Sequence, residues 1–453
     1  MRIGLFTDTY LPTINGIVFV VESLKEQLED EGHEVFVFCP ARTIRPKKIQ
    51  LMTEENPHIM RIPSIPSGLL DDFDFSLFFP PRILRQIREL ELDVIHIFTP
   101  SQIGLLGINV AMKYDFPFVV QHGTDLYEFI ENYPNSIVGT LALVNVVFPM
   151  SVKLDRRDYL EIAKLGRPRR GAAKWGQELI KRTLTMAYSK ADAAIALSKK
   201  SKAQLEDWQD EDYTYNVTLL PSGVDALPRP TKAQLKEFHQ QWGFKESDEV
   251  FGFVGRLGEE KNLPILIDAF DRIGAKRPNA KLLFVGDFEY RETLEAMASA
   301  SNFPERIVFT GSLPRKQLGV VYATMDVFAF PSLKDTQGWV LHEAAHAKLP
   351  IVLIDRELSE VMIDSENGFY SDNTADDFAQ QVSRLLESPE LRERFGIRSK
   401  ELANRFSERR QAKKIVALYD HCIATHTKRL EKKPRSTRRL QQAITALLGH
   451  IDI

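Results

Sequence analysis

The chain has 453 residues, of which 43% are hydrophobic and 27% charged, so it is long enough for two or three domains with large cores. Its 59 basic and 62 acidic residues give a net charge of −3, which argues against a nucleic-acid partner. The two cysteines, Cys39 and Cys422, cannot form a disulfide framework, which indicates a reducing compartment.

The first half of the chain alternates short apolar strands with amphipathic helices. It begins directly with a strand and has no extended apolar leader, so we expect no secretory signal and a cytoplasmic protein. After the loop TDTYLPTING, the spacing of Val20, Leu24 and Leu28 predicts a helix that Gly32 ends. We predict strands at residues 2–6, 35–39, 93–97, 118–121 and 193–197.

A second α/β series follows the turn-rich sequence PSGVDALPRP at residues 221–230. We predict its strands at residues 250–254, 281–285, 307–310, 327–330 and 350–354. The chain therefore reads as two doubly wound, Rossmann-like α/β domains that face a central cleft, where a ligand would bind beyond the carboxyl ends of the strands. We expect the first domain at residues 1–215, the second at 216–405, and a C-terminal helix with a tail at 406–453.

Two basic stretches interrupt this alternation. Residues 132–182 read as an insertion, and residues 153–182 hold ten basic and four acidic side chains. Residues 428–439 hold seven basic and one acidic, and an apolar helix face follows them. Residues 132–152 contain Asn and Pro and are too polar for a convincing membrane span. Residues 153–182 and 428–453 therefore predict binding to an anionic membrane surface, although both stretches can also be solvated surface.

The sequence KDTQGWVLHEAAHAKLP at residues 334–350 predicts a helix that Gly338 opens and Pro350 bounds. The backbone N–H groups of Gly338, Trp339 and Val340 would lie at the helix N-terminus and form a site for a phosphate. Glu343, one turn further, can accept hydrogen bonds from ribose hydroxyls. It can equally be an acidic residue that favours a helix N-terminus.

A second anion site is predicted in FVGRLGEEKN at residues 253–262. Arg256 and Lys261 follow a strand and precede a helix, and two cations at this position suit a diphosphate. The loops VGD at 285–287 and TGSL at 310–313 also follow strands. We expect these loops and the Gly338 loop to meet at one edge of the second sheet.

The first half offers polar residues at the same edge of its own sheet. Asn15 and Gly16 lie in the loop after the first strand, where glycine allows the backbone to approach a charged ligand closely. His96 lies in a predicted strand, and His122 and Asp125 follow another. These residues are candidates for the substrate side of the site.

Together these motifs resemble a family-4 retaining glycosyltransferase of the GT-B fold, over nearly the whole chain to about residue 424. The resemblance implies that Arg256 and Lys261 contact the donor diphosphate and that Gly16 belongs to the glycine loop. It also implies that His122 contacts the reacting sugar. The family's pair of acidic residues, with seven residues between them, corresponds to Asp335 and Glu343, where the first is usually Glu.

The resemblance further implies a reaction without a resident cofactor. The leaving phosphate would assist front-face attack, so His122, Asp335 and Glu343 would bind sugar and transition state and no protein base is needed. Metal is not expected to be required, because cations and a helix terminus would stabilise the diphosphate. The triplets Asp72–Asp74 and Asp210–Asp212 would suit a metal-dependent transferase, but such triplets are common in polar loops.

The opening RIGLFTDTYLPTINGI and the TQG at 336–338 resemble bacterial glycosyldiacylglycerol synthases. That resemblance implies transfer of glucose from UDP-glucose to diacylglycerol at the inner face of the cell membrane. Two alternatives stay open: a soluble transferase acting on a sugar or protein acceptor, and an inactive GT-B binding subunit.

Overall fold

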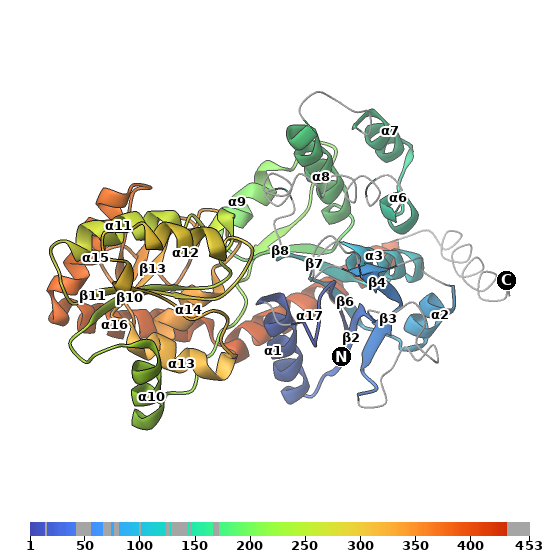
Figure 1. The fold of residues 1–453 in the computed structure, drawn as a ribbon. Coiled ribbons are helices and arrows are strands. Elements are labelled where there is room, and N and C mark those ends of the chain that lie inside the picture. The colour runs from blue at the N-terminus through green and yellow to red at the C-terminus, as the bar shows by residue number, and fades with distance from the viewer. Residues whose placement is uncertain are drawn as a thin grey trace. The chain divides into compact units, whose positions relative to one another are not determined.

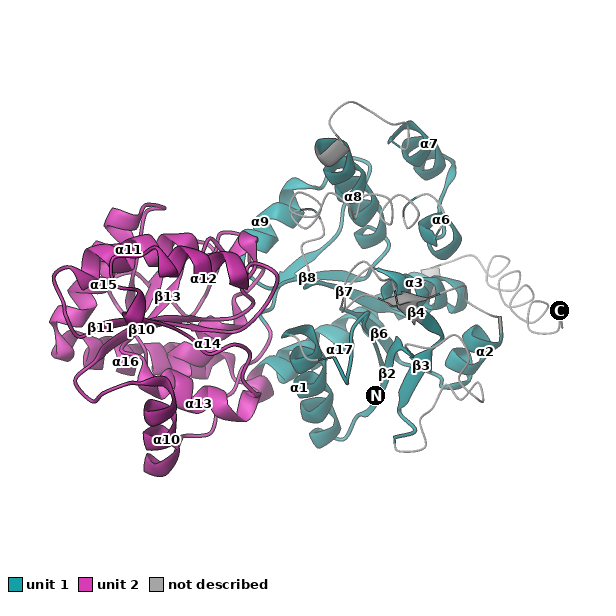
Figure 2. Ribbon diagram, in the orientation of Figure 1, with its two compact units in different colours: residues 1–221, 411–453 teal, residues 222–410 magenta. Residues whose placement is uncertain are grey.

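The computed structural model describes residues 1–13, 16–41, 56–66, 74–76, 81–98, 101–123, 127, 144, 147–165 and 172–432. Two compact units divide the chain, one of residues 1–221 and 411–453 and the other of residues 222–410 (Figure 2). Our expected boundaries fall at residues 215 and 405, a few residues before the changes of unit.

The first unit is built on a parallel sheet of seven strands in the order β3-β2-β1-β6-β7-β8-β9 (Figure 1). Its strands are β1 Arg2–Phe6, β2 Glu34–Pro40, β3 Ile59–Ile62, β6 Val94–Ile97, β7 Phe118–His122, β8 Ala193–Ala196 and β9 Val217–Leu219. A separate antiparallel pair joins β4 Ser64–Pro66 and β5 Asp74–Ser76. The helices are α1 Gly16–Asp30, α2 Pro81–Glu89, α3 Gln102–Tyr114, α6 Phe148–Ser151, α7 Arg156–Leu165, α8 Ala172–Tyr188 and α9 Lys199–Asp207.

Both faces of this first sheet are buried, as expected for parallel strands. Ile3 and Leu5 of β1 pack in one hydrophobic cluster with α1, and Phe6 packs in another cluster with α3. The long helix α17, Glu408–Lys432, contributes Ile415 and Tyr419 to the cluster with α1. From residue 411 onward the C-terminal helix is therefore part of the first unit's core.

The second unit is built on a parallel sheet of six strands in the order β12-β11-β10-β13-β14-β15. The strands are β10 Glu249–Val254, β11 Ala280–Val285, β12 Ile307–Phe309, β13 Val327–Phe330, β14 Ile351–Leu353 and β15 Gly368–Tyr370. The α-helices are α10 Lys232–Trp242, α11 Pro264–Gly274, α12 Arg291–Ser299, α13 Arg315–Thr324, α14 Trp339–His346, α15 Ala375–Glu387 and α16 Pro389–Ala403. Short 3₁₀ helices occur at η3 Glu259–Lys261, η4 Pro304–Arg306 and η5 Asn404–Phe406.

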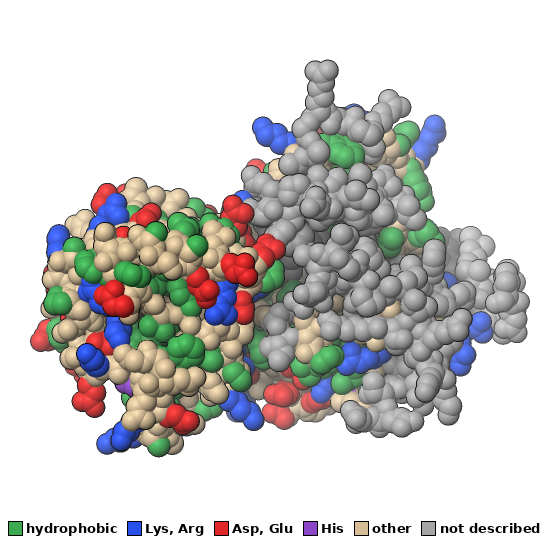
Figure 3. Space-filling view, viewed as in Figure 1, with side chains coloured by type: hydrophobic (Ala, Val, Ile, Leu, Met, Phe, Trp, Pro, Cys, Tyr) green, Lys and Arg blue, Asp and Glu red, His purple; other side chains and the backbone are tan. Residues whose placement is uncertain are grey.

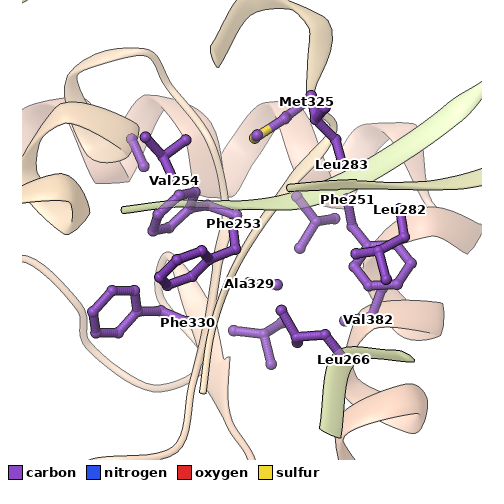
Figure 4. Close-up of a cluster of buried hydrophobic side chains, with 14 of the residues drawn as sticks. Phe251, Phe253, Val254, Leu266, Leu282, Leu283, Met325, Ala329, Phe330 and Val382 are labelled. Carbon is purple, nitrogen blue, oxygen red and sulfur yellow. The ribbon is translucent and has the colours of Figure 1, made fainter. Parts of the chain in front are cut away.

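Aromatic side chains fill the core of the second unit. Phe253 of β10 and Phe330 of β13 stack with ring centroids 5.7 Å apart, and Leu266 and Val382 bring α11 and α15 into the same cluster (Figure 4). Burying one such side chain contributes about 1.5–3 kcal/mol. This packing fixes the strands in register, and so fixes the loops that follow their carboxyl ends.

The predicted α/β architecture is confirmed, and each of the ten predicted strands is present with ends that differ by at most one residue. The sequence did not predict β3, β4, β5, β9 and β15, which are three or four residues long. The helix expected between Gly338 and Pro350 ends earlier, at His346. Lys348 has φ +64°, a left-handed conformation that cannot continue the helix.

Candidate donor site in the second unit

The loops after β10, β11 and β12 lie side by side at the carboxyl edge of the second sheet. The Gly286 N–H donates to the Gly311 carbonyl at 3.0 Å, and the Gly255 N–H donates to the Val285 carbonyl at 2.9 Å. A Cβ on Gly286 would lie 1.8 Å from the carbonyl oxygen of Gly255, and Gly286 has φ +140°. Only glycine fits this approach, which brings the loops after three strands together.

Arg256 and Lys261 lie on the loop after β10. The Arg256 guanidinium lies 4.8 Å from the Phe288 ring centroid and 3.3 Å from a Glu260 oxygen, and its side chain is 54% exposed. Lys261 is only 12% exposed, and its Nζ lies 2.7 Å from Oδ1 of Asp335. Arg256 is therefore accessible to an anionic ligand, whereas Lys261 is neutralised within the protein.

Asp335 lies beside that lysine, with 18% of its side chain exposed. Burial raises the pKa of its carboxyl group, but the charge and hydrogen bond of Lys261 more than offset this, so the pKa lies below its usual value. The second oxygen, Oδ2, is buried with no hydrogen-bond partner among the described residues. A buried acceptor in this state can take a hydrogen bond from a bound hydroxyl group.

Gly338 forms the N-terminus of α14 with φ +67°. A Cβ at this position would lie 2.7 Å from the Leu341 side chain, so the loop requires glycine both for its conformation and for its space. Among the described residues, no side chain caps this helix. Since α14 follows β13 at the carboxyl edge, its positive end lies at the edge to which Arg256 and Lys261 also belong.

Both ends of α14, and Gln337 just before Gly338, are tied to residues 222–224. Gln337 exchanges two hydrogen bonds of 3.0 Å with the backbone of Ser222. The Trp339 indole N–H donates to the Gly223 carbonyl at 3.3 Å, and His346 Nε2 lies 2.8 Å from the Val224 carbonyl. These contacts hold the Gly338 loop on a rigid support within the second unit.

Glu343 is almost completely buried, with 2% of its side chain exposed. Its Oε1 pairs with Arg315 at 2.5 Å, and its Oε2 accepts a hydrogen bond of 2.8 Å from the Tyr322 hydroxyl. Burial, and then the neighbouring Glu343, raise the pKa of Tyr322 well above its ordinary value, so Tyr322 stays a donor. The Arg315 guanidinium also lies 4.8 Å from the Trp339 ring centroid.

Arg315 and Tyr322 were not among the residues predicted from the sequence. Both lie on α13, which follows the loop after β12, so the sequence could have placed Arg315 at the carboxyl edge of the sheet. The sequence could not have indicated that Arg315 pairs with Glu343, which is 28 residues away. Val340, the remaining predicted residue of the α14 N-terminus, is partly buried and packs against the core of the unit.

The structure describes three of the five predicted residues of the first unit, His96, His122 and Gly16. His122, at the end of β7, is 1% exposed; its Nδ1 lies 2.9 Å from the Tyr188 hydroxyl, and its ring packs edge-on against Trp208. Gly16 begins α1. Asn15 and Asp125 lie outside the described residues.

His96 lies in the core and is fully buried. Its Nδ1 lies 2.7 Å from the hydroxyl of Tyr419 on α17, and burial lowers its pKa to about 3. This placement argues against the substrate contact that the sequence suggested, because the imidazole holds α17 and does not reach the surface.

Asp8 of the first unit is buried at the carboxyl end of β1 and was not among the residues predicted from the sequence. It follows β1, and its Oδ1 accepts a 2.8 Å hydrogen bond from the Ile103 N–H at the start of α3. Burial raises its pKa to about 7, although backbone N–H groups of α3 oppose the shift. Its position two residues after a buried strand is the feature of the sequence that could have indicated it.

The acidic triplets do not form a metal site in the described part of the chain. Asp210 pairs with Arg182, and Asp212 pairs with Arg157 at 2.5 Å. Asp72 lies outside the described residues. No group of three or more His, Cys, Asp or Glu side chains with a metal-binding arrangement occurs among the residues that the structure describes.

Two family models match the chain in succession. Residues 14–226 match the family described as Glycosyltransferase Family 4, and residues 235–402 match Glycosyl transferases group 1. The two matches cover most of the first and second halves of the chain.

Relatives of known name match the chain along most of its length. An alpha-monoglucosyldiacylglycerol synthase of Acholeplasma laidlawii is 28% identical over 440 residues, which are 96% of this chain and 100% of that protein. A protein of the same name from Streptococcus pneumoniae is 25% identical and covers 78% of this chain and 70% of its own. A GDP-mannose-dependent alpha-mannosyltransferase of Mycolicibacterium smegmatis is 25% identical over 78% of this chain and 80% of its own.

Solved structures share the fold. Sucrose-phosphate synthase from Thermosynechococcus elongatus has a TM-score of 0.65 at 18% identity and covers 94% of this chain and 99% of its own. Anabaena HepE in complex with UDP-glucose has a TM-score of 0.64 at 16% identity and covers 93% of this chain and 100% of its own. With both family domains present in order and two parallel α/β units, the chain is a glycosyltransferase of the GT-B fold.

Proposed function

We propose that this enzyme transfers glucose from UDP-glucose to a membrane lipid such as diacylglycerol, with retention of configuration. The observation that carries the proposal is the likeness to an alpha-monoglucosyldiacylglycerol synthase over 96% of this chain and the whole of that protein. UDP-glucose carries its glucose in the α configuration, so an α-linked product requires retention.

The second unit supplies the groups that such a donor needs. When the sugar leaves, negative charge develops on the diphosphate, and groups already oriented toward it lower the barrier. Arg256, Lys261 and the Gly338 terminus of α14 are the candidates for this role. These groups can take the place of a divalent cation, so we propose that the reaction requires neither metal nor cofactor.

The acidic pair would bind the sugar and the ribose. Asp335 has a buried oxygen available to accept a hydrogen bond, and we assign it to a donor-sugar hydroxyl. Glu343 has protein partners on both oxygens, so a ribose contact must share it with Arg315 and Tyr322. We assign His122 to contacts with the reacting sugar, not to a general base.

A second donor has specific support. GDP-mannose-dependent alpha-mannosyltransferases match 78% of this chain at 25% identity. The groups proposed for the diphosphate would serve either nucleotide sugar. A GDP-mannose donor is therefore the alternative that a donor panel must include.

A lipid acceptor requires the enzyme to reach a membrane. We propose peripheral association with the inner face of the cell membrane, through residues 153–182 and 428–453. Among the residues that the structure describes, no helix combines the length and the apolar character needed to cross a bilayer.

The test is a donor panel with purified protein. UDP-glucose, UDP-galactose and GDP-mannose are each supplied with diacylglycerol in mixed micelles, and lipid-linked sugar and released nucleotide are measured. We expect transfer from UDP-glucose and an α-linked product by NMR. Transfer only from GDP-mannose would favour the second donor, and transfer only to water-soluble sugars would favour a soluble transferase. Neither transfer nor hydrolysis with any donor would indicate an inactive binding subunit.

A further inference from the structure

Helix α7 exposes a side that combines apolar and basic residues. Arg156, Tyr159, Leu160, Ala163 and Lys164 are all exposed and follow the spacing of one helical face. Tyr159 is 52% exposed and Leu160 is 63% exposed. Large apolar side chains this accessible on adjacent positions are costly in water and indicate an interaction surface.

The opposite side of α7 is firmly attached to the first unit. The Asp158 side chain is fully buried; its Oδ1 accepts a 2.6 Å hydrogen bond from the Tyr213 hydroxyl, and its Oδ2 lies 3.2 Å from Lys190 Nζ. Ile162 and Leu165 are buried on the same side. The helix is therefore held in one orientation, with Tyr159 and Leu160 on the outside.

Two arginines of this region form ion pairs within the protein. Arg157 pairs with Asp212, and Arg182 pairs with Asp210 and Glu161. Both guanidinium groups also lie over the Tyr213 ring. These two arginines serve the structure of the unit, so fewer positive charges remain for an external partner than the sequence count suggested.

Three further basic side chains on or next to α7 are exposed. Arg156 and Lys164 are exposed on α7 itself, and Lys153 is exposed between α6 and α7. Met150 of α6, the helix that precedes α7 in the chain, is a large apolar side chain that is 60% exposed. Hydrophobic and basic side chains are visible together over this part of the molecule in the space-filling view (Figure 3).

We infer that the outer side of α7, with Met150 and Lys153, docks on the surface of a lipid bilayer that contains anionic headgroups. Tyr159 and Leu160 would enter the headgroup region, and Arg156 and Lys164 would pair with lipid phosphates. The positive charge of Arg156, Lys164 and Lys153 argues for this partner, because aliphatic and aromatic side chains flanked by cations match the interface of an anionic bilayer. The inference rests on the proposed lipid acceptor, since it names the surface that brings the enzyme to that lipid.

The test compares variants of the full chain in vesicle flotation. Vesicles of phosphatidylcholine, with and without phosphatidylglycerol, are mixed with wild type, with the double variant Tyr159→Ser and Leu160→Ser, and with Arg156→Glu and Lys164→Glu. Ile397→Ser is the matched control, because Ile397 is 47% exposed on α16 of the other unit. All these side chains are exposed, so thermal unfolding should be unchanged.

We expect the serine variant to bind anionic vesicles about tenfold more weakly, since it loses two inserting side chains. The charge-reversed variant should lose about fivefold or more per residue and lose its preference for phosphatidylglycerol. Ile397→Ser should bind like wild type. Equal binding by all variants, or no vesicle binding by wild type, would overturn the inference. A wild-type dimer that the serine variant splits in sedimentation would instead assign this surface to a second copy of the chain.

A second measurement separates this inference from the proposed function. Transfer to diacylglycerol dispersed in detergent micelles needs no docking on a bilayer, so the serine variant should retain wild-type activity there. If wild type transfers no sugar to diacylglycerol while vesicle binding still depends on Tyr159 and Leu160, the docking surface stands and the proposed acceptor fails.

Discussion

Replacing Lys261 by alanine tests whether the donor site is held by an ion pair within the protein. Lys261 and Asp335 are 12% and 18% exposed, with 2.7 Å between Nζ and Oδ1. Removing one member of a buried ion pair lowers the free energy of unfolding by about 3–5 kcal/mol. Because this pair is partly exposed, we expect a loss of about 2–3 kcal/mol. Lys261→Ala should therefore lower the stability of the second unit as well as abolish most transfer.

The loss of stability in Lys261→Ala should depend on pH. Lys261 holds the pKa of Asp335 below its usual value of 3.8 despite burial, so the stabilisation is present above that pH and is lost as the pH falls through the lower, folded-state pKa. In Lys261→Ala the buried carboxylate has lost its counter-charge, so its pKa rises. The loss of stability should be largest near neutral pH and should shrink as the pH falls toward the raised pKa.

The assay is urea unfolding across this pH range for Lys261→Ala, Asp335→Asn and the double variant. The second substitution should recover much of the loss, because no unpaired charge remains buried. Arg277→Ala is the control, since Arg277 forms a pair of similar exposure with Glu249 away from the proposed ligand site and should leave transfer unchanged. An unfolding midpoint for Lys261→Ala equal to that of wild type at neutral pH would refute the reasoning.

Three further predictions concern the same edge of the sheet. Glu343→Gln should reduce kcat/KM about 100-fold or more and destabilise the unit by about 2–4 kcal/mol, because Arg315 loses its buried counter-charge; unchanged turnover would remove Glu343 from the donor site. Gly338→Ala should cost about 1–3 kcal/mol in urea unfolding and raise the donor KM, because φ is +67° and Leu341 lies where Cβ would go; wild-type values would show that this loop does not bind the donor. EDTA should leave transfer unchanged, and loss of activity that Mg²⁺ or Mn²⁺ restores would favour a metal-dependent reaction.

The local pattern of apolar residues in the sequence was sufficient to predict most of the strands of the fold. A buried parallel strand is a continuous apolar run, as in Val327–Phe330, and the structure has that strand with the predicted ends. The strands that escaped prediction, such as Gly368–Tyr370, are only three or four residues long and hold their place through pairing with a neighbour. Such strands depend on tertiary contacts, and a short segment carries little local signal of them.

For the candidate site, the sequence indicated which loops meet but not which side chains pair. The glycines after β10, β11 and β12 were predictable because the carboxyl ends of parallel strands share one edge. The partners of Glu343 were not, because Arg315 and Tyr322 reach it from another helix. Whether a histidine at a strand end faces ligand or core is equally a tertiary property, as His96 shows.

The Lys261–Asp335 pair has a consequence for donor binding that the isolated motifs did not suggest. If Lys261 is to contact the donor diphosphate, the ammonium must share its hydrogen bonds between that ligand and Asp335. A lysine has three donors, so both contacts can coexist, and the unpartnered Oδ2 of Asp335 leaves that carboxylate with an acceptor for a sugar hydroxyl. One ion pair would then align the diphosphate and the sugar together. Asp335→Asn should accordingly weaken donor binding, measured by calorimetry with UDP-glucose, more than it weakens binding of UDP alone; equal losses for the two ligands would show that Asp335 serves only to hold Lys261.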